Sequence, residues 1–220
     1  MPLTVTRDGD VALLTWNDGE NRLNYDSLGR LNEVLDELQG TPGPLALVLT
    51  GEGKFFSNGL DLARFGDKPD ELFGTIALLR RTIGRIMLFP AYTVAALNGH
   101  TFAGGGLLSM AFDHRVMRED RGFWCMNEAA IGMVLDEYLY GIIAHRLPRA
   151  TAVEAAQTAR RYPGPEALAA GIVEDIADEA SLLPRAIEQA QRHAALDRRI
   201  LGAQKKIIHG DFAAFIGFSE

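Results

Sequence analysis

The spacing of apolar residues along the chain predicts an alternation of short strands and longer helices. Residues 3–7 and 11–16 read as two strands, because the aspartates and glycine at 8–10 form a hairpin-turn signal between them. Residues 45–50 are almost entirely apolar, which is typical of a strand buried on both faces of a sheet. Further short strands are predicted at residues 93–97, 113–117 and 171–176.

Longer segments repeat apolar residues every three or four positions, the spacing of one helix face. The first begins at Asp26, the expected N-cap, continues through Leu28 and Leu31, and stops at Gly40. The second covers about residues 70–89 and ends before Pro90, because proline cannot continue a helix. Further helices are predicted at residues 137–147, 150–159, 179–193 and 196–209, the last of them amphipathic.

This alternation of strands and helices predicts one α/β domain. No linker, low-complexity run or block of like charges divides the 220 residues. We expect residues 1–195 to form the core and residues 196–220 to add a C-terminal helical segment to the same domain, as a cap or an assembly element.

Composition and charge exclude several classes of function. The net charge of −7 gives nucleic-acid binding no electrostatic support, although a local basic patch can still hold a small anion. The single cysteine, Cys125, excludes an internal disulfide and metal sites built on paired cysteines. No apolar run reaches the roughly 18 residues of a membrane span, and residues 1–16 lack a signal-peptide core. We therefore expect a cytoplasmic protein with no membrane or nucleic-acid partner.

Two glycine-bearing loops carry the main chemical signal. Glycines 104–106 stand between a strand-like and a helix-like run, and residues 51–62 hold a second such loop after a buried strand. The first N–H groups of a helix lack internal partners, so such a loop suits an anion. Two N–H donors aimed at one carbonyl oxygen form an oxyanion hole, worth roughly 3 kcal/mol per donor. The glycines alone are equally compatible with a tight turn that binds nothing.

The ordered set of motifs resembles the enoyl-CoA hydratase/isomerase (crotonase) superfamily over roughly residues 10–195. The resemblance is carried by LVLTGEGKFFSNGLDL at 47–62, AALNGHTFAGGG at 95–106, FDHRVM at 112–117 and ALAAGIVE at 167–174. It implies a crotonase-like ββα spiral core with a helical C-terminal assembly region, in a homotrimer or hexamer. It also implies an acyl-CoA thioester substrate, with coenzyme A as part of that substrate and no other cofactor or metal.

The resemblance also implies roles for particular residues. In the family, two backbone N–H groups hold the thioester oxygen while an enolate forms, and these map to Leu60 and Gly105. Hydratases carry one glutamate two residues after the glycine triplet and a second one later, and the two positions here are Leu108 and Glu128. One carboxylate suffices to move a proton between two carbons. The pattern resembles Δ3,Δ2-enoyl-CoA isomerases of fatty-acid metabolism, which convert 3-enoyl-CoA to trans-2-enoyl-CoA, with Glu128 as the catalytic group.

Alternatives to this interpretation remain open. Asp136 follows Glu128 by eight residues, where dienoyl-CoA isomerases resemble this chain in carrying a second acid, yet it also precedes a predicted helix and suits an N-cap. A weak enoyl-CoA hydratase is a further rival. Glu128 is also compatible with an ordinary solvated or helix-terminal glutamate. A rival of another class is a catalytically silent acyl-CoA-binding paralogue, since the fold does not fix the function.

In the family, backbone groups around the Leu60 loop mostly bind the adenine of coenzyme A and basic side chains bind its phosphates, so the resemblance makes basic and polar side chains near this loop candidates. Arg22, Asn58 and Lys54 are the first candidates, followed by Arg64 and by Lys205 and Lys206 of the last helix. Each is equally compatible with an ordinary surface position. We expect His100 to pack or to line a rim, His145 and His193 to lie on helix surfaces, and Cys125 to be buried. Four apolar or aromatic residues either line an acyl tunnel or belong to the core: Leu72, Phe73, Trp124 and Tyr138.

Overall fold

The computed structural model describes residues 3–66 and 68–218. Its strands are β1 (Leu3–Asp8), β2 (Val11–Trp16), β3 (Ala46–Gly51), β4 (Phe55–Ser57), β5 (Tyr92–Leu97), β6 (His100–Phe102), β7 (His114–Arg118), β8 (Trp124–Cys125) and β9 (Asp175–Ala177). Its helices are α1 (Tyr25–Gly40), α2 (Leu62–Phe65), α3 (Pro69–Met87), α4 (Gly104–Ser109), the 3-10 turn η1 (Glu128–Ile131), α5 (Glu137–Arg146), α6 (Arg149–Thr158), α7 (Gly164–Ala169), α8 (Glu179–Ala194) and α9 (Arg198–Phe215).

The strands form two sheets that the chain visits in turn. The larger sheet has the order β1-β2-β3-β5-β7-β9, in which the β1–β2 hairpin is antiparallel and all other pairs are parallel. The smaller sheet has the order β4-β6-β8 and is parallel throughout. The consecutive pairs β3–β4, β5–β6 and β7–β8 each place one strand in each sheet before a helical segment follows. This ββα spiral confirms the predicted fold class.

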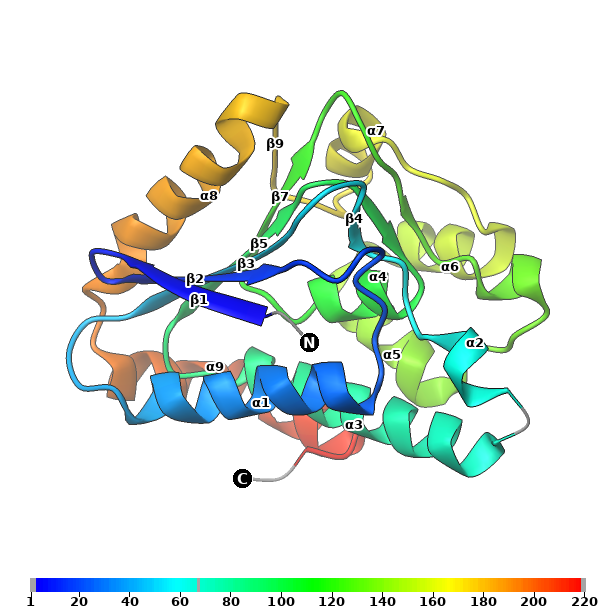
Figure 1. The fold of residues 1–220 in the computed structure, drawn as a ribbon, viewed down its shortest axis with the longest axis horizontal. Coiled ribbons are helices and arrows are strands. Elements are labelled where there is room, and N and C mark those ends of the chain that lie inside the picture. Colours follow the sequence, from blue (N-terminus) through cyan, green and yellow to red (C-terminus); the bar gives the residue numbers. More distant parts are fainter. Residues whose placement is uncertain (1–2, 67, 219–220) are drawn as a thin grey trace.

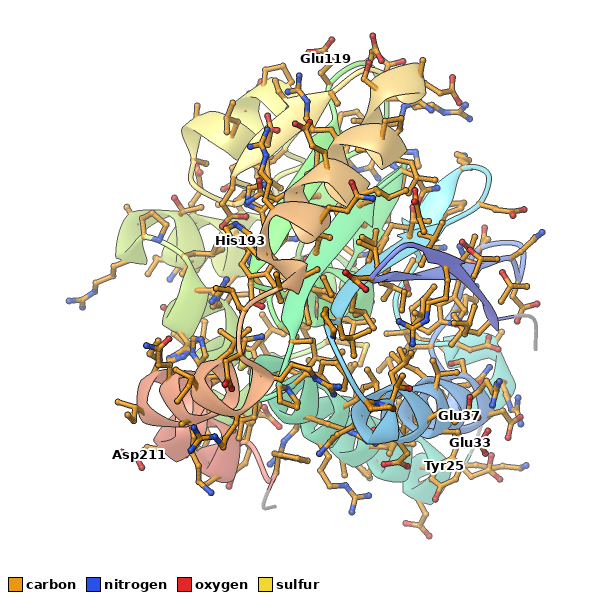
Figure 2. All side chains as sticks on the ribbon, turned by 90° about the vertical axis from the view of Figure 1, so that its left-hand side faces the viewer. Tyr25, Glu33, Glu37, Glu119, His193 and Asp211 are labelled. Atoms are coloured by element: carbon orange, nitrogen blue, oxygen red, sulfur yellow. The ribbon has the colours of Figure 1, made fainter. Side chains whose placement is uncertain are left out.

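Strand β3, in the middle of the larger sheet, is buried on both faces, as its apolar sequence predicted. Along β3, Leu47 and Leu49 join the main core, whereas Ala46 and Val48 face the opposite way and pack with α8. Alanines recur every fourth residue on the inner side of α8, at 186, 190 and 194, so that this helix lies close to the strands. Figure 1 shows α8 over one face of the sheet and α1, α3 and α9 together beyond the other, and in Figure 2, turned by 90°, α8 lies in front of the strands.

The start of α1 differs from the prediction by two residues. Asn24, not Asp26, is the N-cap: its side chain accepts the Ser27 N–H at 2.9 Å, and the Ser27 hydroxyl accepts the Asn24 N–H at 2.8 Å. Both residues are buried, whereas the Asp26 side chain points outward and pairs with Arg64 at 2.7 Å. This reciprocal capping box satisfies two helix-end groups, which a single aspartate at position 26 could not do.

Two predicted elements near the C-terminus also shift. The strand expected at 171–176 is confined to β9, because Gly171 takes a φ of +71° and the N–H of Ile172 returns to the Ala167 carbonyl, closing α7. Helix α9 extends six residues beyond the predicted end and packs against α3. No helix in the described part of the chain is both long and apolar enough to cross a membrane.

Candidate active site

A cavity of about 760 Å³ opens where the three strands of the smaller sheet end. Asn58 and Leu60 follow β4, Ala103 and Gly104 follow β6, and Glu128 follows β8. The strands are parallel, with Ser57 opposite Thr101 and Phe102 opposite Cys125, so their carboxyl ends meet at one edge. The remaining wall comes mainly from α3 and from the segment between η1 and α5: Arg22, Leu62, Leu72, Phe73, Ile76, Ala77, Leu79, Arg80, Leu107, Asn127, Ile131, Met133, Val134, Asp136 and Leu139.

The two glycine-bearing loops pack directly against each other at this edge. Gly59 has a φ of +78°, and a Cβ there would lie 3.0 Å from the Cβ of Ala103 and 3.1 Å from the Phe102 carbonyl oxygen. Ala103 itself has a φ of +47°, a conformation that a non-glycine residue adopts at a cost of about 1–3 kcal/mol. The close approach therefore depends on glycine at 59 and on strained backbone at 103.

The backbone N–H groups of Leu60 and Gly105 lie on these two loops. Within the described residues the Leu60 N–H donates no backbone hydrogen bond, although the N–H groups of Gly59 and Asp61 on either side both find acceptors. Gly105 is the second residue of α4, and the first internal bond of that helix is donated only at Leu107. Two donors without regular partners thus stand at the carboxyl ends of neighbouring strands.

Gly105 cannot carry a side chain in this arrangement. A Cβ there would lie 2.7 Å from both the Cβ and the carbonyl oxygen of Ser57 in β4. The glycine therefore allows α4 to start in contact with the neighbouring strand. The buried strands predicted before the two loops are present as β3 and β5, and the loops themselves contain the short strands β4 and β6, which the sequence did not predict.

Glu128 is the buried carboxylate of the cavity. Its side chain lies at the start of η1, the residue is 7% exposed, and its Oε2 has no hydrogen-bond partner among the described residues. Burial raises the pKa of Glu128 to about 7, because water no longer stabilises the charged form. A carboxyl group with this pKa can give and take a proton near neutral pH.

The two other positions of the predicted acid pattern have different environments. Leu108 is fully buried in the core, and its neighbour Leu107 contributes to the cavity wall. Asp136 lines the cavity but is exposed, and its Oδ1 accepts the Leu139 N–H at 2.8 Å as the N-cap of α5. The predicted cap is therefore present, and the same carboxylate also faces the cavity.

Among the basic and polar candidates, the structure brings Arg22 and Asn58 together. Both bind Glu20: Asn58 Nδ2 donates to Glu20 Oε2 at 2.9 Å and Arg22 Nε at 2.8 Å. The Asn58 hydrogen bond, helped by Arg22, holds the pKa of Glu20 below its ordinary value. The sequence interpretation missed Glu20, and its signal was only proximity to Arg22.

The other basic candidates lie outside the lining of the cavity. Lys54 lies over the Phe55 ring, with its Nζ 5.4 Å from the centroid. Arg64 pairs with Asp26. Lys205 is 3% exposed and binds the Ala91 carbonyl and Asp113 inside the fold. Lys206 lines a separate hollow together with Arg85 and Phe89.

The remaining aromatic, histidine and cysteine candidates divide between cavity and core. Leu72 and Phe73 line the cavity, whereas Trp124 is fully buried beneath Gly106 and Tyr138 contacts Phe215. His100 packs among three phenylalanine rings, and Cys125 is buried. His145, expected on a helix surface, hydrogen-bonds His209 of α9 at 2.9 Å, and His193 packs on Tyr92. Across the described residues, no three His, Cys, Asp or Glu side chains are grouped to hold a metal ion.

The chain is similar in sequence and in fold to known proteins. The family model for enoyl-CoA hydratase/isomerase matches residues 6–214. The peroxisomal enoyl-CoA delta isomerase 2 of Arabidopsis thaliana is 33% identical over 184 residues, covering 79% of this chain and 76% of that protein. The apo enoyl-CoA isomerase structure of Mycobacterium tuberculosis has a TM-score of 0.88 at 29% identity, covering 98% of this chain and 94% of that one. Human mitochondrial Δ3-Δ2-enoyl-CoA isomerase has a TM-score of 0.88 at 24% identity, covering 97% and 85%, which shows the shared fold alone.

Proposed function

Because the chain belongs to the enoyl-CoA hydratase/isomerase (crotonase) family of enzymes, we propose that it isomerises 3-enoyl-CoA thioesters to trans-2-enoyl-CoA in fatty-acid metabolism. The observation that carries the proposal is Glu128, the one buried carboxylate among the described lining residues of the cavity. The delta isomerase names of the similar plant proteins support the same reaction.

The proposed mechanism moves one proton between two carbons of the acyl chain. The thioester oxygen accepts hydrogen bonds from the N–H groups of Leu60 and Gly105. These bonds lower the energy of the negative charge that develops on that oxygen. Ionised Glu128 removes a proton from C2, and the electrons pass into a dienolate whose charge rests on the thioester oxygen. Protonated Glu128 then returns the proton to C4, so that the double bond lies between C2 and C3 and the enzyme regains its starting state.

The environment of Leu108 favours isomerisation over hydration. Addition of water is easiest with two acid/base groups, one to activate water and one to move the other proton. Leu108 is an alkyl group buried in the core, so α4 supplies no second carboxylate to the cavity. Coenzyme A enters as part of the substrate, with the Glu20–Arg22–Asn58 cluster as the proposed contact for its polar portion.

A panel of thioesters tests the reaction. We expect 3-enoyl-CoA to be converted to trans-2-enoyl-CoA, seen as rising ultraviolet absorbance of the conjugated thioester, and 2-enoyl-CoA to remain unhydrated. Rapid loss of 2-enoyl-CoA absorbance would instead identify a hydratase. Binding of every thioester without turnover would identify a silent acyl-CoA-binding protein.

A dienoyl-CoA isomerase is the second candidate, because the Asp136 carboxylate faces the cavity as well as capping α5. Two acids suit a longer proton transfer across a diene. The same panel includes 3,5-dienoyl-CoA, and faster turnover of this substrate than of 3-enoyl-CoA would favour this candidate.

The rate should depend on pH through Glu128. The proposed base acts when ionised, and burial raises its pKa to about 7. We therefore expect kcat/KM for 3-enoyl-CoA to rise with pH up to about that value and then to level off, falling about tenfold per pH unit below it. The pH profile is measured from initial rates at pH values below and above 7. Circular dichroism at each pH confirms that the protein is folded. A flat profile across pH 7 would contradict the assignment.

A further inference from the structure

One cationic side chain in the cavity is not used by the proposed mechanism. Arg80 lies on α3 among apolar lining residues such as Ile76, Ala77 and Leu139. A plain alkyl chain needs only an apolar wall, and it would displace water from a guanidinium without replacing the lost hydrogen bonds. A cation in this position therefore calls for a ligand group that can accept them.

The guanidinium of Arg80 is held in one orientation by two other elements. Its Nε donates to the Ile216 carbonyl oxygen at 3.1 Å, at the end of α9. Its Cζ lies 3.8 Å from the ring centroid of Tyr138 in α5, so the planar group stacks on the ring. Stacking on the ring and the Nε bond leave the two terminal amino groups of Arg80 available, and neither has an acceptor within residues 3–66 and 68–218.

Arg80 lies on a different wall from the proposed coenzyme A contacts. The Glu20–Arg22–Asn58 cluster belongs to the loops before α1 and after β4, whereas Arg80 lies where α3 meets α5 and the end of α9. Leu79, the residue before it, reaches within 3.3 Å of where a Cβ of Gly104 would be. Leu60, Gly104 and Arg80 therefore line one cavity, and an acyl chain whose thioester is held near Leu60 and Gly105 can extend within it toward Arg80.

We propose that Arg80 binds a carboxylate at the distal end of the acyl chain, so that the cavity favours ω-carboxyl acyl-CoA thioesters over their methyl-ended counterparts. This inference rests on the proposed function only in placing the thioester near Leu60 and Gly105. A carboxylate can accept both terminal amino groups of the oriented guanidinium. Because Arg80 is partly exposed, we expect a preference of about tenfold, near the lower end for hydrogen bonds between charged groups.

Binding of saturated thioesters tests this without turnover, so a failed isomerase assignment would not affect the result. Isothermal titration calorimetry compares methyl-ended and ω-carboxyl acyl-CoA pairs of increasing chain length with the wild-type protein. We expect the ω-carboxyl member to bind about tenfold more tightly at the length that reaches Arg80, and equally at shorter lengths. Equal affinity within every pair would overturn the proposal, whatever the variants show.

Two variants separate recognition from a structural role of Arg80. Arg80→Met should remove the preference while leaving methyl-ended binding within about twofold, and Arg80→Lys should keep part of it, because the charge remains without the planar fork. Thermal unfolding of both variants measures how much the contacts of Arg80 with Tyr138 and Ile216 contribute to stability. If Arg80→Met weakens both members of a pair alike, the residue contacts coenzyme A or supports the wall, and the proposal is wrong.

Discussion

Replacing Glu128 with glutamine is expected to lower kcat for 3-enoyl-CoA by about 10²- to 10⁴-fold, because glutamine keeps the shape but cannot take a proton. Binding of the thioester should be unchanged, since the proposed oxyanion donors are backbone groups. The variant should also be at least as stable as the wild type above pH 7. The pKa of Glu128 is raised in the folded protein, so its ionised form opposes folding there, and the neutral amide removes that cost.

Asp136→Asn provides the matched control for this substitution. Asparagine is as good an N-cap as aspartate, so α5 should keep its cap and the protein its stability. A one-carboxylate isomerase should retain nearly full activity on 3-enoyl-CoA in this variant. Full activity of Glu128→Gln would refute the catalytic assignment, and strong loss of 3,5-dienoyl-CoA turnover in Asp136→Asn would favour the dienoyl reaction.

Replacing Lys205 with methionine is expected to destabilise the fold by about 3 kcal/mol. The Lys205 Nζ donates to the Ala91 carbonyl oxygen at 2.8 Å and to Asp113 Oδ2 at 2.5 Å, and both side chains are largely buried. Methionine fills similar space but leaves a carboxylate and a carbonyl without their cationic donor. Urea unfolding followed by circular dichroism measures the loss, which corresponds to a melting point lower by roughly 6–12 °C.

Two further variants test the cause of that loss. Lys206→Met, at the adjacent exposed position, should change stability by no more than about 0.5 kcal/mol. The double variant Lys205→Met/Asp113→Asn should recover part of the loss, because asparagine removes the unpaired charge and can still accept the Thr93 N–H that Asp113 accepts at 2.8 Å. A Lys205→Met variant as stable as Lys206→Met would show that the pair contributes little.

Much of the candidate site was predictable because its determinants are local. A backbone N–H donor needs only a particular glycine-bearing loop, so Leu60 and Gly105 could be proposed as donors from short motifs that resemble those of the family. The identity of a residue at a fixed distance from such a motif, such as Leu108 or Glu128, is likewise readable along the chain. That Glu128 is buried and unpaired is not, because its surroundings come from elements far apart in sequence.

The smaller sheet escaped prediction for a different reason. Strands β4, β6 and β8 have two or three residues each, too few for an alternating pattern to be distinguished from a loop. Their pairing is decided by where the longer strands β3, β5 and β7 place the following residues. The N-cap of α1 was also mispredicted. Asn24 and not Asp26 caps the helix, because Asn24 and Ser27 each accept the backbone N–H of the other.

The sequence by itself determined the α/β class through the periodicity of its apolar residues, and the two glycine-bearing loops and the carboxylate at position 128 through turn chemistry and residue identity. The spiral arrangement of the strands was expected only from the resemblance to the family. Only the tertiary structure decided which charged side chains line the cavity. It directed Lys205 into a buried pair with Asp113, joined Arg22 and Asn58 through Glu20, and fixed Arg80 between Tyr138 and Ile216. A long basic side chain can reach in many directions, so its partner is set by the elements that fold around it and not by its place in the chain.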